Sequence, residues 1–247
     1  MARLNICVIG FVGLLSMSVS CAETRLGGMT LPQAFPDERV AKLVEAVTDG
    51  NYAEADKQLK AGADINMVGT DGISPLLWVI ATRNIKANEY MLKAGANPNY
   101  RDEKRHGSAM YLAAGGNSPE LLELLLKYKG NPNLIGPRDE PILHIAVEQD
   151  RRKNIELLLK YGGDVNIVNG FGSTAAQDAV ALGRFDLVAY FLERGLTYNL
   201  QGLAKTVEGR PVPPNSDAQR WKDKVIVMLK ERGAKFPAFD PKNPSGK

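Results

Sequence analysis

The stretch that decides the fold is Leu59-Lys60-Ala61-Gly62-Ala63-Asp64-Ile65-Asn66, which returns in altered form three more times. The later copies read LKAGANPN, LKYKGNPN and LKYGGDVN, and they end at Asn99, Asn133 and Asn166. The final asparagines are therefore 33, 34 and 33 residues apart. A period in this range, with a Leu-rich run before a Gly-containing stop, predicts a solenoid of stacked helical units.

Each unit carries an apolar helix stripe that needs a neighbour. In the third unit the leucines at 121, 122, 125 and 126 fall on one side of a helix. The fourth unit repeats the stripe with Ile155, Leu158 and Leu159. Adjacent units can bury these stripes against one another, and no unit is expected to be stable alone.

The second helix of each unit is expected to stop at a residue in the left-handed conformation. Glycine has no side chain to clash there, and it occupies this place in four units, at Gly62, Gly95, Gly162 and Gly195. Lys129 stands there in the third unit. Either Lys129 is itself left-handed or Gly130 takes over the stop, and the residues leave both alternatives open.

The start of each unit carries a family resemblance. The segment Pro141-Ile142-Leu143-His144-Ile145-Ala146 is similar to the T-P-L-H-x-A opening of an ankyrin repeat, and equivalent segments begin at residues 41, 74, 108 and 174. The resemblance implies an all-α ankyrin-repeat solenoid of helix-turn-helix units with short hairpin loops. It also implies that His144 makes a structural hydrogen bond between repeat elements.

The pattern divides the chain into four regions. Residues 1–22 are expected to be a signal peptide, 23–37 a flexible or extended linker, 38–200 five ankyrin repeats, and 201–247 a C-terminal helical cap with a flexible tail. The cap includes a helix over residues 221–233, which is expected to close the apolar end of the stack.

The N-terminal residues indicate export. Arg3 precedes an apolar run from Ile6 to Leu15, which is typical of a secretory leader and short for a bilayer span. We therefore expect a periplasmic protein of bacterial origin. Two processing routes remain open. Cys21 resembles the lipidated cysteine of a bacterial lipoprotein, which would anchor the protein to the outer membrane, but Ser18 stands where a large aliphatic residue is usual. Alternatively, Ser20-Cys21-Ala22 is a site for ordinary signal peptidase.

Composition and motifs give no support to catalysis, cofactors, metals or nucleic acid. The formal net charge is only +3, and the two histidines, His106 and His144, belong to no metal-binding pattern. The segment Gly170–Ala175 matches G-x-G-x-x-A, but it falls at a hairpin of a repeat rather than after a strand of a βαβ unit. Pairing any two of the scattered acidic residues as acid and base would be arbitrary. We expect no enzyme.

The ankyrin resemblance places recognition on the hairpin tips and the exposed side of the first helices, which line a concave groove. Aromatic and arginine side chains dominate interface energetics, and the tip from residue 100 to 106 is one residue longer than the others. The same register includes Leu182. Carried over by register, the expected partner-binding residues are Tyr100, Arg101, Arg105, His106, Arg138, Glu148, Gln149 and Phe171.

Three polar or glycine-rich segments near this surface also have purely structural interpretations. The mixed charge run from Arg101 to Arg105 is also typical of a soluble loop, and Arg151-Arg152-Lys153 is expected to form a solvated turn. The pair Gly115-Gly116 either keeps the groove open or marks a loose helix end, and both interpretations remain open.

The exported leader, the short stack and the closing segment from Val225 to Pro237 together resemble bacterial ankyrin immunity proteins. That resemblance implies a partner that is a toxic secreted lipase or phospholipase, delivered into the periplasm by type VI secretion. Periplasmic stress-protection ankyrin proteins, which assist a partner enzyme such as catalase, share the architecture and remain the alternative. An enzyme using the solenoid as a scaffold is the disfavoured class.

Overall fold

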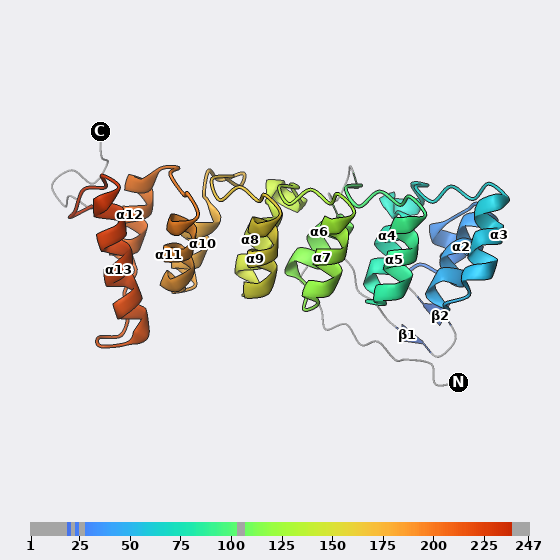
Figure 1. Cartoon of the computed structure of the whole chain (residues 1–247), viewed down its shortest axis with the longest axis horizontal. Coiled ribbons are helices and arrows are strands. Elements are labelled where there is room, and N and C mark those ends of the chain that lie inside the picture. The colour runs from blue at the N-terminus through green and yellow to red at the C-terminus, as the bar shows by residue number, and fades with distance from the viewer. Residues whose placement is uncertain (1–18, 21–22, 25–27, 103–106, 239–247) are drawn as a thin grey trace.

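A computed structural model describes residues 19–20, 23–24, 28–102 and 107–238. Helix pairs stand side by side in one row, and the loops that join successive pairs run along one edge (Figure 1). The predicted all-α solenoid is confirmed. A two-residue antiparallel hairpin, β1 (Val19–Ser20) with β2 (Glu23–Thr24), precedes the stack.

Five helix pairs form the repeats. They are α2 (Glu38–Thr48) and α3 (Tyr52–Lys60), α4 (Pro75–Ala81) and α5 (Ile85–Lys93), α6 (Ala109–Gly115) and α7 (Pro119–Lys127), α8 (Ile142–Glu148) and α9 (Arg152–Lys160), and α10 (Ala175–Ala181) and α11 (Phe185–Glu193). The first helices of the pairs contact one another in sequence order, from α2 to α10. Short turns η1 (Thr70–Gly72) and η2 (Pro137–Asp139) lie at two of the hairpin tips.

The core lies between successive pairs, where the apolar stripes meet. Leu122 and Leu125 of α7 and Ile155 and Leu158 of α9 are all fully buried, and α7 contacts α9. Burying one such side chain contributes about 1.5–3 kcal/mol. Because each stripe is covered by the next repeat, stability is a property of neighbouring pairs.

The stops of the second helices agree with the glycine pattern. Gly62, Gly95, Gly162 and Gly195 all have positive φ, and Lys129 is itself left-handed with φ 66°. The alternative that Gly130 takes over the stop is therefore wrong. Gly130 is required for packing instead, because a Cβ there would lie 2.5 Å from Met110 Sδ.

Asparagine side chains link each repeat to the next along the row. The Nδ2 of Asn133 donates to the carbonyl of Gly162 at 3.2 Å, and its Oδ1 accepts from the backbone N–H of Asp164 at 2.8 Å. The same pair of bonds recurs at Asn66, Asn99 and Asn166. We call this series the asparagine ladder. It explains why the repeated phrase ends in asparagine.

The expected linker is partly ordered, which corrects the prediction. Helix α1 (Leu31–Ala34) ends beside Phe35, which is 1% exposed and meets the Trp78 ring edge-on at 5.9 Å between centroids. A Cβ at Gly69 would lie 2.2 Å from the carbonyl oxygen of Ala34, so this contact needs glycine. Residues 31–35 thus pack against the joint between the first and second repeats.

The C-terminal end is covered by α12 (Leu200–Gly209) and α13 (Asp217–Glu231), which starts earlier than the predicted helix. Val225 and Leu229 of α13 are fully buried, and α13 contacts α11. Trp221, the first residue of the predicted helix, remains partly exposed.

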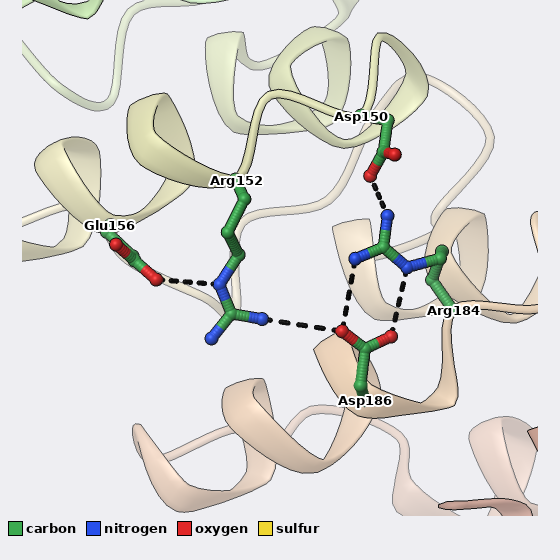
Figure 2. A network of polar contacts seen from close by, with 5 residues as sticks. All are labelled: Asp150, Arg152, Glu156, Arg184 and Asp186. Carbon is green, nitrogen blue, oxygen red and sulfur yellow. Dashed lines mark hydrogen bonds and ion pairs between the residues drawn. The ribbon is translucent and has the colours of Figure 1, made fainter. Parts of the chain in front are cut away.

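Ion pairs join the fourth and fifth repeats at the turns opposite the hairpin tips. Figure 2 shows Arg184 between Asp150 and Asp186, and the Arg184 guanidinium holds the Asp186 carboxylate through two bonds of 3.0 and 3.1 Å. Arg152 reaches Asp186 at 3.6 Å and Glu156 at 2.7 Å. Partial burial opposes ionisation of Asp186, but the Arg184 bonds outweigh it and hold the pKa of Asp186 below its usual value.

Two buried asparagines in second helices differ in the hydrogen bonds that their side chains make. Asn154 donates to the carbonyls of Ala113, Ala114 and Gly116 at 2.8–3.1 Å. Asn88 is fully buried and its Nδ2 donates to the carbonyls of Val79 and Asn84 at 3.3 and 2.8 Å, each of which also accepts a backbone N–H. Its Oδ1 has no hydrogen-bond partner among the described residues. Asn88 occupies the core position that Leu122, Ile155 and Val188 hold in later repeats.

Loss of one rung of the asparagine ladder is expected to destabilise the stack. Asn133→Ala removes two inter-repeat hydrogen bonds and should lower the free energy of unfolding by about 1–2 kcal/mol. Urea denaturation followed by circular dichroism measures it. Asn117→Ala is the matched control, since Asn117 is exposed outside the ladder. Equal stability of the two variants would contradict a structural role for the ladder.

The two buried asparagines are expected to respond in opposite directions to the same change. Asn88→Leu removes an unsatisfied buried carbonyl and adds apolar contact, so unfolding should cost about 1 kcal/mol more. Asn154→Leu leaves three carbonyls without their donor and should destabilise the chain by about 1–3 kcal/mol. The melting temperatures of the two variants test this prediction. If both substitutions raised the melting temperature, or both lowered it, the contrast between Asn88 and Asn154 would be refuted.

Candidate partner-binding face

The first-helix face is defined here as the exposed sides of α8 and α10 together with the hairpin tips that precede them. On α10, Asp178, Ala181 and Leu182 fall on one side because they are three and four residues apart. Leu182 is 48% exposed although it is apolar. On α8, Glu148 is exposed and takes the place equivalent to Ala181.

Two neighbouring tips present Arg138 and Phe171 at equivalent positions, 33 residues apart. Both are exposed, and Phe171 is 89% exposed. The Phe171 tip is held by Asn169, whose Oδ1 accepts from the backbone N–H groups of Phe171 and Ser173 at 3.0 and 3.1 Å. The backbone carrying the aromatic ring is thus fixed before any partner arrives.

Below the tips, two inter-repeat bonds position two carboxylates, Asp178, which is partly exposed on the face, and Glu140, which is buried. His144, which is buried, has its Nδ1 2.6 Å from Asp178 Oδ2, in agreement with the structural role that the ankyrin resemblance implied. The hydroxyl of Tyr111 donates to Glu140 Oε2 at 2.7 Å. Burial, and then the bond to Glu140, raise the pKa of Tyr111. Gly136 leaves room for the Tyr111 ring, because a Cβ there would lie 2.2 Å from it.

Glu148 carries the most perturbed carboxyl of this face. Partial burial, the charge of Glu140 and a hydrogen bond with Glu140 raise the pKa of Glu148 to about 7. Asp178 raises it further, whereas Arg138 acts in the opposite direction. Glu148 is exposed to solvent, and two neighbouring carboxyls repel its ionised form. The face therefore has an excess of negative charge beside Glu148.

Other predicted partner residues have internal roles or lie elsewhere. Tyr100 is half-buried and its hydroxyl donates to the carbonyl of Gly72 at 3.0 Å, so the expected exposed aromatic is a link between tips. Arg101 donates to the carbonyl of Ile135 at 2.9 Å. Gln149 is half-buried at the end of α8. Arg105, His106 and the lipidation candidate Cys21 lie outside the described residues.

The Gly115-Gly116 pair ends α6 and is held by the next repeat. Arg151 donates from Nε to the carbonyl of Gly115 at 3.1 Å, and Asn154 binds the carbonyls around it. The pair therefore marks the end of the helix, as one interpretation expected, but that end is held by hydrogen bonds rather than loose. The expectation that Arg151-Arg152-Lys153 is only a solvated turn is wrong, since Arg152 also lies in the ion-pair network of Figure 2.

The described residues offer little that could perform chemistry. A cavity of about 350 Å³ lies between the turn before α11 and the start of α13, but its charged side chains are already paired, Arg184 with Asp186 and Asp217 with Arg220. Within residues 28–102 and 107–238, no cluster of His, Cys, Asp and Glu could hold a metal ion. Nor is any helix there long and apolar enough to cross a membrane.

The ankyrin-repeat family model matches residues 43–136 and 110–202, which together are more than half of the chain. The chain belongs to the ankyrin-repeat family. Ankyrin repeats are protein-interaction modules. The tips and first helices described above are therefore the parts of an interaction scaffold.

Several ankyrin-containing proteins are similar over part of their length. A putative ankyrin repeat protein of Rickettsia felis is 28% identical over 137 residues, 45% of this chain and 50% of the relative. The nuclear factor NF-kappa-B p105 subunit of Gallus gallus is 35% identical over 99 residues, 40% of this chain and 9% of the relative. The transient receptor potential channel pyrexia of Drosophila melanogaster is 32% identical over 86 residues, 35% of this chain and 9% of the relative. The matches thus span half or less of these relatives.

Sequence analysis missed two carboxylates of the face. Glu140 stands directly before the opening motif of its repeat, and Asp178 stands inside that motif in the next repeat. No other repeat has a charged residue at the position of Glu140, and only the first repeat, with Glu45, has one at the position of Asp178, so the repeat pattern gave little signal for them. Only the packing of adjacent repeats brings both of them close to Glu148.

The raised pKa of Glu148 predicts a pH dependence of stability. The folded chain holds this proton more tightly than the unfolded chain, whose carboxyl has a pKa near 4.5. The stabilising contribution is therefore complete below that value and is lost as the pH rises through about 7. Glu148→Gln should flatten the fall in melting temperature over this range. Glu231→Gln, at an exposed position of α13, is the control, and identical profiles for both variants would contradict the raised pKa.

Proposed function

We propose that this ankyrin-repeat protein is exported and binds another protein through the first-helix face. The observation that carries the proposal is the pair of exposed anchors on fixed tips, Arg138 and Phe171. Aromatic and arginine residues supply most of the energy at protein interfaces, and an apolar ring exposed to water gains most when a partner covers it. Glu148 and Gln149 at the end of α8 extend the same surface.

Within that class we propose an immunity role. The partner would be a toxic lipase or phospholipase that type VI secretion delivers into the periplasm, and binding would block access of substrate to it. A specific interface buries roughly 800 Å² on each partner, which a few adjacent tips and helices could supply. The leader-like residues 1–22 and the resemblance of the closing segment to immunity proteins support this proposal. No chemistry is required of this chain.

Export and anchoring belong to the same proposal. The run from Ile6 to Leu15 and the residues around Cys21 support secretion into the periplasm, with or without a lipid on Cys21. Labelling with a fatty-acid probe distinguishes the two routes. If Cys21 is lipidated, the wild-type chain takes up the label and a Cys21→Ser variant does not, whereas after ordinary signal-peptide cleavage neither chain is labelled.

Protection from the effector is the direct test. Cells that express, in their periplasm, a lipase encoded beside this gene should survive when the wild-type chain is co-expressed. The double variant Arg138→Ala with Phe171→Ala should keep its fold, because both residues are exposed, but should lose most of the protection. Loss of about 1–2 kcal/mol per anchor corresponds to at least a tenfold weaker complex.

A matched double variant, Arg210→Ala with Val227→Ala, removes an exposed arginine and an exposed apolar residue far along the chain, and it should protect fully. Equal protection by both double variants would rule out the first-helix face. A neighbouring catalase gene whose product gains activity from this chain would instead favour the stress-protection alternative.

A further inference from the structure

At the end of α10, the first-helix face exposes an apolar site that no described residue covers. Leu182 follows the last turn of α10 and is 48% exposed, and Ala181 beside it is also exposed. An exposed leucine gains favourable free energy when a partner covers it and removes it from water. This site lies on the same side of α10 as Asp178.

Negative charge surrounds this apolar site. Glu140 and Asp178 both act on Glu148 as repelling carboxyls. Glu140 comes from a hairpin tip, Glu148 from α8 and Asp178 from α10. Their other neighbours are already committed, since Tyr111 donates to Glu140 and His144 lies against Asp178. Arg138 is the one cation whose charge opposes the effect at Glu148. Three carboxyls thus face one guanidinium.

We infer that the partner's docking element presents a cationic side chain, arginine or lysine, next to a large apolar one, with the cation beside Glu148 and Asp178, whose negative charge the buried Glu140 reinforces, and the apolar group on Leu182. This inference rests on the proposed binding role of the face and adds the chemistry of the partner. A guanidinium suits the site best, because its planar fork can bond two carboxylates at once. These carboxylates would repel acidic side chains of a partner, so the surface also selects against acidic segments.

The raised pKa of Glu148 adds a consequence for binding. A partner cation stabilises the ionised carboxylate, so binding releases a proton wherever Glu148 was protonated. Affinity should therefore be lower at about pH 5.5 than at about pH 8. The charged groups that act on Glu148 are Arg138 and Glu140 of the tip and Asp178 of α10. Tyr111 of α6 contacts Glu140, and His144 of α8 contacts Asp178.

A displayed random-peptide library, selected on the immobilised full chain, tests the inference with a defined probe. Enriched peptides should carry arginine or lysine beside leucine, phenylalanine or another large apolar residue. Synthetic copies should bind Glu148→Arg about tenfold or more weakly than the wild type, which corresponds to about 1.4 kcal/mol. Leu182→Ser should also weaken binding, whereas Glu231→Arg, with the same charge change on exposed α13, should not.

The outcomes separate this inference from the proposed function. Peptides that lose affinity in Phe171→Ala or Leu182→Ser but show no preference for a cation, or bind Glu148→Arg unchanged, would overturn the charge assignment and leave the face standing. Enrichment of acidic peptides, or of none, would overturn it as well. Peptides indifferent to every substitution on the face would count against the proposed function too.

Discussion

The structure depends on the asparagine ladder, which fixes how far and at what angle one repeat lies from the next. Each rung bonds both a carbonyl and an N–H of the following repeat, as Asn133 does with Gly162 and Asp164. Apolar packing between helices is strong but has little direction, whereas a two-point amide contact accepts only one register. The core therefore holds the repeats together, and the ladder determines their spacing.

Regular spacing is what turns the hairpin tips into a surface. Arg138 and Phe171 occupy the same position in successive repeats, so their separation is set by the ladder rather than by either loop. The tips are also tied to one another, for example through Arg101 and the carbonyl of Ile135. Ordering entropy is thus lost during folding rather than during binding, which favours a rigid interaction surface.

The stack is not equally well satisfied along its length. Asn154 completes the end of α6 from the next repeat, whereas Asn88 places an unpaired carbonyl at a core position. A buried polar group without a partner costs about 1–3 kcal/mol, so the second repeat is the weaker part of the stack. The first-helix face with its excess of carboxyls lies farther along, over α8 and α10, where the ion pairs of Arg184 reinforce the joint.

The sequence by itself determined the repeat, its helices and its stops, because these depend on short-range periodicity and on backbone preferences such as that of Gly62. It also placed Arg138, Glu148 and Phe171 on one kind of surface through register alone. Tertiary structure decided which side chains the fold uses internally: Tyr100 became a link to Gly72, and Phe35 of the expected linker became a cap on Trp78. It also decided the charge beside Glu148, because Glu140 and Asp178 come near only when separate repeats pack, and electrostatic interaction depends on distance in space rather than along the chain.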